Sequence, residues 1–404
     1  MTRRSGKVSN GVMPQATASR LHLSEIAPHL VQSEIRSMTV ECDRVGGVNL
    51  AQGVCDTELP APVSEAAIAA IHHGHNIYTR LDGIAPLRAA ISKKLASYNG
   101  VQADPDTQVL ATSGATGAMY AACLALFNPG DEIILFEPFY GYHLNTMLTL
   151  RIKPAPQPLA TGTWELDVDA LRAAITPKTR AILINTPSNP CGKVFTRAEI
   201  EAIGEIALEH DLFLLTDEIY EYFLFGGVKH VSAASLPGLA ERTITISGFS
   251  KTFAITGWRI GYLAADARWI PSIGYFHDLT YVCAPSPAQY GAAAGLAQLG
   301  ADFYRHLSSD YQHKRDLLCS ALNEAGLTPS VPDGAYYVLA DATILPGATA
   351  REKARELLKK TGVAAVAGSA FYSKGRGENL LRFCFAKQDE ALEDACTRLT
   401  STAL

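Results

Sequence analysis

The feature that most constrains the fold is an alternation of short, β-rich apolar runs with longer stretches of helical periodicity between Thr107 and Ala265. Such an alternation is typical of a parallel sheet that is covered by helices on both faces. It predicts six strands, at Gln108–Thr112, Glu132–Phe136, Arg180–Asn185, Leu212–Thr216, Thr243–Ser247 and Trp258–Ala264. The clearest helices between them are expected at Ala115–Phe127 and Arg197–His210.

After Pro287 the pattern changes to a long helical stretch that reaches Glu324, followed by strand signals at Ala335–Ala340 and Leu380–Ala386. This predicts a smaller α+β domain, and a chain of 404 residues with 48% apolar content is long enough for two domains. We expect a flexible N-terminal tail (1–26), a large domain (61–287) and a small C-terminal domain (288–404). Residues 27–60 are too few to fold alone, so they are expected to pack with the small domain or to cross onto a partner subunit.

Composition narrows the classes of function. A net charge of -5, with no run of basic residues, gives no reason to expect a nucleic-acid partner. No apolar run reaches the roughly 18 to 20 residues that span a bilayer, and the first 20 residues lack the apolar stretch of a secretory signal. The eight cysteines form no C-x-x-C pair, which argues against a metal site and against a disulfide framework. A cytoplasmic protein that acts on small molecules is expected.

Lys251 has a sequence context that favours a chemical role. Lys251 lies among small and hydroxyl residues directly after the strand expected at Thr243–Ser247, and Arg259 follows eight positions later. A lysine in such a loop can lose its proton and attack a carbonyl carbon, while a guanidinium can hold a phosphate. A pyridoxal 5'-phosphate (PLP) enzyme needs both groups, although a surface lysine and a structural arginine would look the same in isolation.

The residues that follow the other strands supply further groups, because ligands of open α/β sheets bind beyond the carboxyl ends of the strands. The turn Ser113-Gly-Ala-Thr-Gly117 opens a helix whose free N–H groups suit a phosphate. Tyr140 can offer a flat face to a planar ring, and the proline-rich turn at 186–192 fixes the amide of Asn189.

The fourth strand ends in Asp217-Glu-Ile-Tyr220. A carboxylate at the mouth of a buried strand is costly unless it is paired, and a protonated ring nitrogen would pair it. The phenol of Tyr220 could reach an oxygen on the same ring. Each feature alone has an ordinary structural explanation, such as a tight turn, a core aromatic or a helix N-cap. Their joint occurrence at successive strand ends indicates a PLP site.

These motifs together resemble the class I/II aminotransferases of PLP fold type I, the group that includes aspartate, aromatic and kynurenine aminotransferases. The resemblance extends from Val48 to Ala386. Its most specific motif is Ser-Lys-Thr-Phe-Ala-Ile-Thr-Gly-Trp-Arg-Ile-Gly at 250–261, followed by Asn-Pro-x-Gly at 189–192 and Asp-Glu-x-Tyr at 217–220. Three further segments match the family: Asn49-Leu-Ala-Gln-Gly53, Tyr78-Thr-Arg-Leu-Asp-Gly83 and Leu381-Arg-Phe383.

The resemblance implies a role for each matching residue. Lys251 would be the catalytic residue that forms the internal Schiff base, and Asp217 would pair with the pyridine nitrogen. The resemblance also implies that the α-carboxylate of the substrate is bound by Arg382, with help from Asn189 and Gly53. The other residues implied to hold the cofactor are Gly114, Ala115, Thr116, Tyr140, Asn189, Tyr220, Ser250, Arg259 and, on the neighbouring subunit's phosphate, Tyr78. A homodimer with active sites at the subunit interface is therefore implied.

Some positions depart from the family pattern. Gly248 stands where serine is common, so that the hydroxyl for the phosphate is expected from Ser250 or Ser247. Cys55 and Ala367 stand where proline is usual in the family, and Cys191 occupies the variable position of Asn-Pro-x-Gly. These positions bear on specificity more than on chemistry.

The activity that the resemblance implies is transfer of an amino group between an L-amino acid and a 2-oxo acid. A PLP-dependent lyase or cyclase of the same fold, such as a carbon–sulfur β-lyase or an aminocyclopropane-carboxylate synthase-like enzyme, remains the alternative. A PLP-binding regulatory module is disfavoured, because the first 27 residues are too short for a DNA-binding domain. The motifs contain no second arginine placed for a side-chain carboxylate, which favours a substrate with a neutral side chain.

Overall fold

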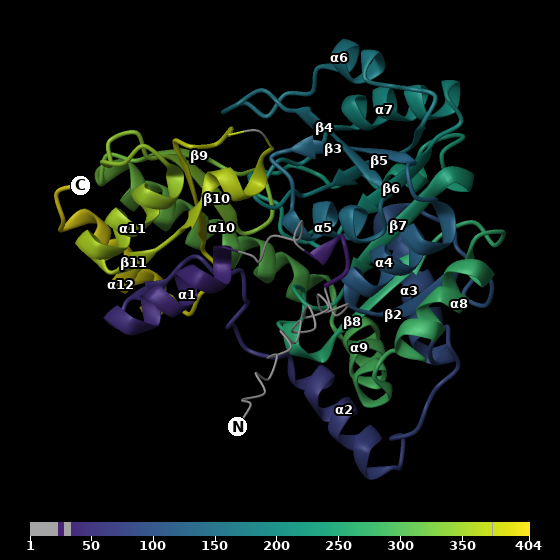
Figure 1. The fold of residues 1–404 in the computed structure, drawn as a ribbon. Helices are drawn as coiled ribbons and strands as arrows, with labels where there is room; N and C mark the ends of the chain where they lie inside the picture. The colour runs from purple at the N-terminus through teal and green to yellow at the C-terminus, as the bar shows by residue number, and fades with distance from the viewer. Residues whose placement is uncertain (1–22, 28–33, 374) are drawn as a thin grey trace, which may run out of the picture.

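The computed structural model describes residues 23–27, 34–373 and 375–404. Its largest element is a seven-stranded sheet of order β2-β8-β7-β6-β5-β3-β4 (Figure 1). Neighbouring strands are parallel except β8, which runs antiparallel to both β2 and β7. The strands are β2 (Val109–Ser113), β3 (Glu132–Glu137), β4 (Lys153–Pro158), β5 (Thr179–Asn185), β6 (Phe213–Asp217), β7 (Thr243–Gly248) and β8 (Ile260–Ala264). The α/β fold expected from the sequence is confirmed.

Strand β4 was not predicted, because its sequence Lys-Pro-Ala-Pro-Gln-Pro carries three prolines. Proline cannot donate a hydrogen bond to a neighbouring strand, and it is therefore tolerated only at the edge of a sheet. β4 is indeed an edge strand that pairs with β3 alone. The other six strands lie within two residues of their predicted bounds.

Helices cover both faces of this sheet, because alternate residues of each strand point to opposite sides. Leu215 of β6 packs in the cluster that includes α4 (Gly114–Leu126), α5 (Gly141–Thr149) and α8 (Ile270–Tyr281). Its neighbour Leu214 packs on the other face, with α6 (Val168–Ala173) and α7 (Arg197–Glu209). On that same face α3 (Ala85–Lys94) and α9 (Ser286–Gln298) cover β2 and β8, and α2 (Ala61–His72) packs on α9.

The smaller α+β domain holds an antiparallel sheet of order β12-β13-β10-β9. Its strands are β9 (Thr328–Ser330), β10 (Tyr337–Asp341), β12 (Val366–Ala367) and β13 (Leu380–Cys384). Its helices are α10 (Ala301–Glu324), α11 (Ala350–Thr361) and α12 (Asp389–Thr400). The single helical stretch expected from Pro287 to Glu324 was wrong, because the chain breaks at 299–300 between α9 and α10.

The segment before residue 60 lies against this smaller domain. Helix α1 (Glu34–Val45) is drawn in purple beside α11 and α12, and β1 (Val48–Asn49) pairs in parallel with β11 (Val363–Ala364) (Figure 1). Most of the expected N-terminal tail, 1–26, falls outside the described residues. Because α9 packs on α2 and α3, we propose that the boundary between the domains follows α9 and does not fall at 287.

Short helical turns complete the chain: a π-helical turn at Leu95–Asn99 and 3-10 turns at Ala233–Ser235, Ala240–Arg242, Thr256–Trp258 and Gly368–Phe371. No helix within the described residues has the length and apolar character needed to cross a membrane.

Candidate active site

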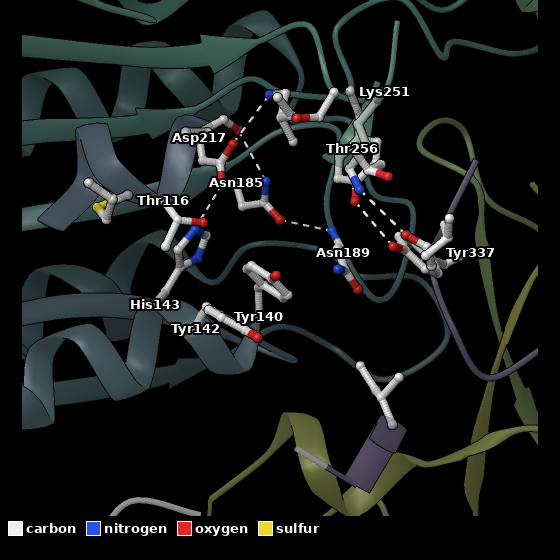
Figure 2. A pocket seen from close by; sticks show the side chains of 18 of the residues that line it. Thr116, Tyr140, Tyr142, His143, Asn185, Asn189, Asp217, Lys251, Thr256 and Tyr337 are labelled. Atoms are coloured by element: carbon white, nitrogen blue, oxygen red, sulfur yellow. Dashed lines mark hydrogen bonds and ion pairs between the residues drawn. The ribbon is translucent and has the colours of Figure 1, made fainter. Parts of the chain in front are cut away.

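A cavity of about 450 Å³ opens at the carboxyl ends of β5 and β6 and is closed on the other side by β10, β13 and the start of α1. It gathers every predicted site residue except Gly114 and Tyr78: Gly53, Ala115, Thr116, Tyr140, Asn189, Asp217, Tyr220, Ser250, Lys251, Arg259 and Arg382. Figure 2 shows Asp217, Asn185 and His143 on one side of this cavity and Lys251 and Tyr337 on the other.

Lys251 enters the cavity from the loop after β7. Its Nζ donates to the carbonyl of Gly53 at 3.4 Å and lies 6.0 Å and 5.6 Å from the ring centres of Tyr220 and Tyr336. Burial lowers the pKa of the Lys251 amine, and the positive charge of Arg259 lowers it further, against the opposing effect of Asp217. A lowered pKa raises the fraction of uncharged amine, which is the form that acts as a nucleophile or a base.

Asp217 ends β6 in register with Asn185 at the end of β5. The Asp217 carboxylate is buried and accepts hydrogen bonds from His143 Nε2 at 2.8 Å and from the backbone N–H of Ile219 at 3.2 Å. Asn185 holds the strand end by donating to the Asp217 carbonyl at 3.1 Å. In the described chain no lysine or arginine pairs with Asp217, so this carboxylate can stabilise a positive charge in the cavity.

Arg382 projects from β13 and is 1% exposed. Its Nη1 donates to Asn189 Oδ1 at 3.1 Å and its Nη2 to the Ala51 carbonyl at 2.5 Å, while its guanidinium lies 4.4 Å from the ring centre of Tyr337. Nε is buried without a hydrogen-bond partner, and no acidic side chain of the described residues pairs with this arginine. A buried guanidinium without a counter-charge is costly, and a bound carboxylate would supply one.

The part of the cavity at the start of α4, which we call the phosphate corner, offers groups that bind an anion. Gly114 has φ +71°, and a Cβ at this position would stand 2.7 Å from Arg259 Nη2. Gly114 is therefore the residue that lets Arg259 approach the start of α4, although it lies outside the cavity lining. Ser113 makes no side-chain cap on α4, so the first N–H groups of this 13-residue helix are left for a ligand. Ser250 and Thr256 add hydroxyl groups.

The packing explains why glycine occupies position 248. A Cβ on Gly248 would meet the Cα of Gly261 at 2.9 Å, so a larger residue would push β7 away from β8. Of the two serines expected to supply a hydroxyl, Ser247 instead donates to Glu221 Oε1 at 2.9 Å inside the protein. Ser250 is the one that lines the cavity.

Sequence reasoning missed three residues of this site. His143 and Asn185 orient Asp217, and Tyr337 shares a hydrogen bond of 3.2 Å between its hydroxyl and that of Tyr220. Asn185 could have been found as the polar last residue of a predicted strand, and His143 as the polar residue after the aromatic turn. Tyr337 lies within an expected strand, and no motif distinguished it.

Tyr78 does not join the cavity in this chain. It lies in the loop between α2 and α3, and it is 77% exposed. The cavity of one chain therefore does not include this predicted site residue.

The residues present fit PLP. Lys251 supplies an amine for its aldehyde, Asp217 a carboxylate for its ring nitrogen, Tyr140 a flat face and the start of α4 with Arg259 an anion site. A mostly parallel sheet with this set of groups at its strand ends defines a PLP-dependent enzyme of fold type I.

Comparison with known proteins gives the family. The model of the family "Aminotransferase class I and II" matches residues 45–399. The chain is 36% identical to aromatic-amino-acid aminotransferase 2 of Thermococcus litoralis, over 91% of this chain and 94% of that protein. It is 37% identical to the probable N-succinyldiaminopimelate aminotransferase DapC of Mycobacterium tuberculosis, over 91% and 95%.

The solved structure of N-succinyldiaminopimelate aminotransferase from Mycobacterium tuberculosis superposes with a TM-score of 0.90 at 36% identity, covering 94% of this chain and all of that one. The chain belongs to the class I and II aminotransferases. It is a PLP-dependent enzyme that transfers an amino group between an amino acid and a 2-oxo acid.

Proposed function

We propose that this aminotransferase acts on L-amino acids whose α-carboxylate is bound by Arg382, and that Lys251 is its catalytic base. The observation that carries the proposal is the guanidinium of Arg382, buried in the same cavity as the Lys251 amine with its Nε unpartnered. A substrate carboxylate at this point would receive two parallel hydrogen bonds from the guanidinium. Such a two-point contact would fix the orientation of the substrate Cα relative to Lys251.

PLP, when bound, carries the amino group between the two substrates and takes up the electron pair released as the Cα proton leaves. Lys251 would hold the cofactor through its amine, and the same amine, when free, would take the proton from the substrate Cα. Asp217 would keep a proton on the ring nitrogen, and the hydrogen bond from His143 holds the Asp217 carboxylate in place. Asn189, Tyr220 and Tyr140 line the cavity where they could hold the ring. The residues that could hold the phosphate are Ala115, Thr116, Ser250 and Arg259.

We also propose that the working form is a homodimer. Tyr78 and Ile77 are 77% and 79% exposed, and exposed apolar side chains also lie on α2 at Ile68 and Ile71. Contiguous exposed apolar surface marks an interaction site. A second copy of the chain would cover this surface and place Tyr78 at the partner's phosphate corner.

The eight free cysteines are compatible with a reducing compartment, and we propose the cytoplasm as the location. The relatives are named for aromatic, aspartate, kynurenine and N-succinyldiaminopimelate substrates, so that their names do not single out one amino donor.

The test is to add amino acids one at a time to the PLP-loaded protein and to follow the absorbance of the cofactor. A true substrate should convert the cofactor to its amine form once and then stop, and a 2-oxo acid should reverse the change. Continuous release of ammonia or of a cyclic product without a 2-oxo acid would support the lyase or cyclase instead.

A further inference from the structure

A buried glutamine of α9 holds the loop that carries Tyr78. Gln289 is fully buried, and the other buried residues of α9 are only serine, alanine and glycine. Its Oε1 accepts a hydrogen bond from the backbone N–H of Ile84 at 2.8 Å. Its Nε2 donates to Thr79 Oγ1 at 3.1 Å and to the Ala284 carbonyl at 2.8 Å. An amide in a core is costly unless it is hydrogen-bonded, and two of these three bonds go to the loop.

The same helix also holds the segment before Tyr78. Tyr290, the neighbour of Gln289, stacks on His75 with ring centres 4.3 Å apart, and its hydroxyl shares a hydrogen bond of 3.2 Å with His75 Nδ1. Asn76 Nδ2 donates to a carbonyl in the last turn of α2 at 3.0 Å. The chain is therefore held on both sides of Tyr78, while the Tyr78 side chain between them is 77% exposed.

The end of this loop lies close against the large sheet. Gly83 has φ +93°, and a Cβ there would stand 2.5 Å from Ala111 Cβ and 2.8 Å from Gln289 Oε1. The backbone N–H of Ala111 in β2 donates to the Asp82 carbonyl at 3.0 Å. These contacts fix the backbone of the loop, so the direction in which Tyr78 projects is set by its own chain.

We propose that Gln289 is a positioning residue for the active site of the partner subunit. Through Thr79 it fixes the backbone next to Tyr78, so that the Tyr78 hydroxyl meets the cofactor phosphate bound by the partner. The inference rests on the proposed function, because it needs the homodimer that places Tyr78 at the partner's phosphate corner. Thr79 suits this role, since its hydroxyl accepts from Gln289 and donates to the Arg80 carbonyl at 2.9 Å. Gln289 does not line the cavity of its own chain.

Gln289→Leu removes three hydrogen bonds and keeps a side chain of similar size. It should weaken PLP binding by up to about tenfold, the loss expected for Tyr78→Phe, because the tyrosine hydroxyl is no longer held at the phosphate. Combining the two substitutions should add no further loss, since both remove the same contact, whereas independent effects would multiply. The PLP dissociation constants of the two single variants and the double variant measure this.

Thr79→Val breaks the contact from the loop side and leaves the core of the protein intact. It should weaken PLP binding by about threefold or more, since one neutral hydrogen bond is lost. It also replaces Gln289→Leu in every test below if that variant does not fold. Thr397→Val is the control: its hydroxyl donates to the Glu393 carbonyl on α12 at 2.9 Å, and PLP binding should not change.

Mixed dimers show in which subunit the effect appears. One chain carries Gln289→Leu and keeps Lys251, the other carries Lys251→Ala and keeps an unaltered loop, and two different affinity tags allow the mixed dimer to be purified. Its only working site combines Lys251 of the first chain with Tyr78 of the second. Its activity should therefore depend on PLP concentration as that of the unmodified enzyme does. Placing Gln289→Leu and Lys251→Ala on the same chain, opposite an unmodified one, should bring back the weak affinity.

The opposite pattern, with weak affinity only when Gln289→Leu and Lys251 share a chain, would show that Gln289 acts within its own subunit and would overturn the proposal. So would unchanged PLP binding in Gln289→Leu and Thr79→Val, or losses that multiply in the double variant with Tyr78→Phe. Unchanged PLP binding in Tyr78→Phe itself would instead refute the shared site of the proposed function, and this inference with it.

Discussion

At the scale of single residues, His277 shows how a buried side chain can support the phosphate corner without lining it. His277 is fully buried in α8, and its Nε2 accepts a hydrogen bond of 3.0 Å from the backbone N–H of Ser113. A nitrogen that accepts must be unprotonated. Burial lowers the pKa of His277 to about 4, against a smaller opposing effect of Asp278, and so keeps the ring neutral.

This shift predicts a dependence of stability on pH. The unfolded chain binds a proton on His277 below about pH 6.5, whereas the folded protein binds it only below about 4. The contribution of His277 is thus complete above pH 6.5 and is lost as the pH falls toward 4, by up to about 3 kcal/mol. His277→Gln keeps an acceptor but cannot titrate, so its free energy of unfolding in urea should fall less steeply over this range. Identical slopes would show that His277 does not carry the effect.

The predicted residues that the structure brings together in the cavity share one property: each belongs to a motif whose chemistry is local. Lys251, Asp217 and Asn189 directly follow predicted strands, and the shared edge of the sheet brings them together. Tyr337 could not be placed in this way. Its contact with Tyr220 depends on how the smaller domain packs against the large sheet, and no local motif contains that information.

At the scale of elements, the turn between β2 and α4 works as a unit with Arg259. Both Gly114 and Arg259 have positive φ, at +71° and +56°, and they meet at the start of α4. A glycine is needed here for two reasons, the backbone conformation and the approach of the guanidinium.

Gly114→Ala separates these reasons when it is compared with Gly130→Ala. Gly130 also has positive φ, at +92°, but a Cβ there would meet nothing within 4 Å. Both variants should lose about 1 kcal/mol of stability from the strained backbone. Gly114→Ala alone should weaken PLP binding, by about tenfold or more, because Arg259 is displaced from the phosphate site. Equal PLP dissociation constants for the two variants would contradict the assignment of this corner.

The elements themselves were largely predictable where local pattern decides. Helix α7 begins at a capping box formed by Thr196 and Glu199, and its start was predicted correctly. β4 and the break at 299–300 between α9 and α10 were missed for a different reason. β4, with a proline at every second position, forms a strand because it can pair with β3 at the edge of the sheet. The break between α9 and α10 contains no proline that would have signalled the end of the helix.

At the scale of the whole molecule, one predicted site residue stays outside the cavity of its own chain. Tyr78 is exposed and does not line the cavity, and the apolar side chains Ile68 and Ile71 of α2 are exposed as well. A dimer would resolve both features at once, and activity would then depend on association.

We therefore expect a particle of twice the 43.3 kDa chain mass in sedimentation experiments. Tyr78→Phe should leave this mass unchanged but weaken PLP binding by about tenfold, because a hydrogen bond to a charged phosphate is lost. Tyr275→Phe is the control, since Tyr275 is likewise exposed, at 58%, but lies on α8 outside the matching motifs. A monomer with full turnover would rule out the shared site.

Borohydride reduction of the PLP-loaded protein, followed by peptide mapping, shows which amine holds PLP. We expect the reduced cofactor on the peptide that contains Lys251, and no labelled peptide from Lys251→Ala. Attachment to any other lysine of the unmodified protein would refute Lys251 as the residue that holds PLP and, once free, transfers the proton.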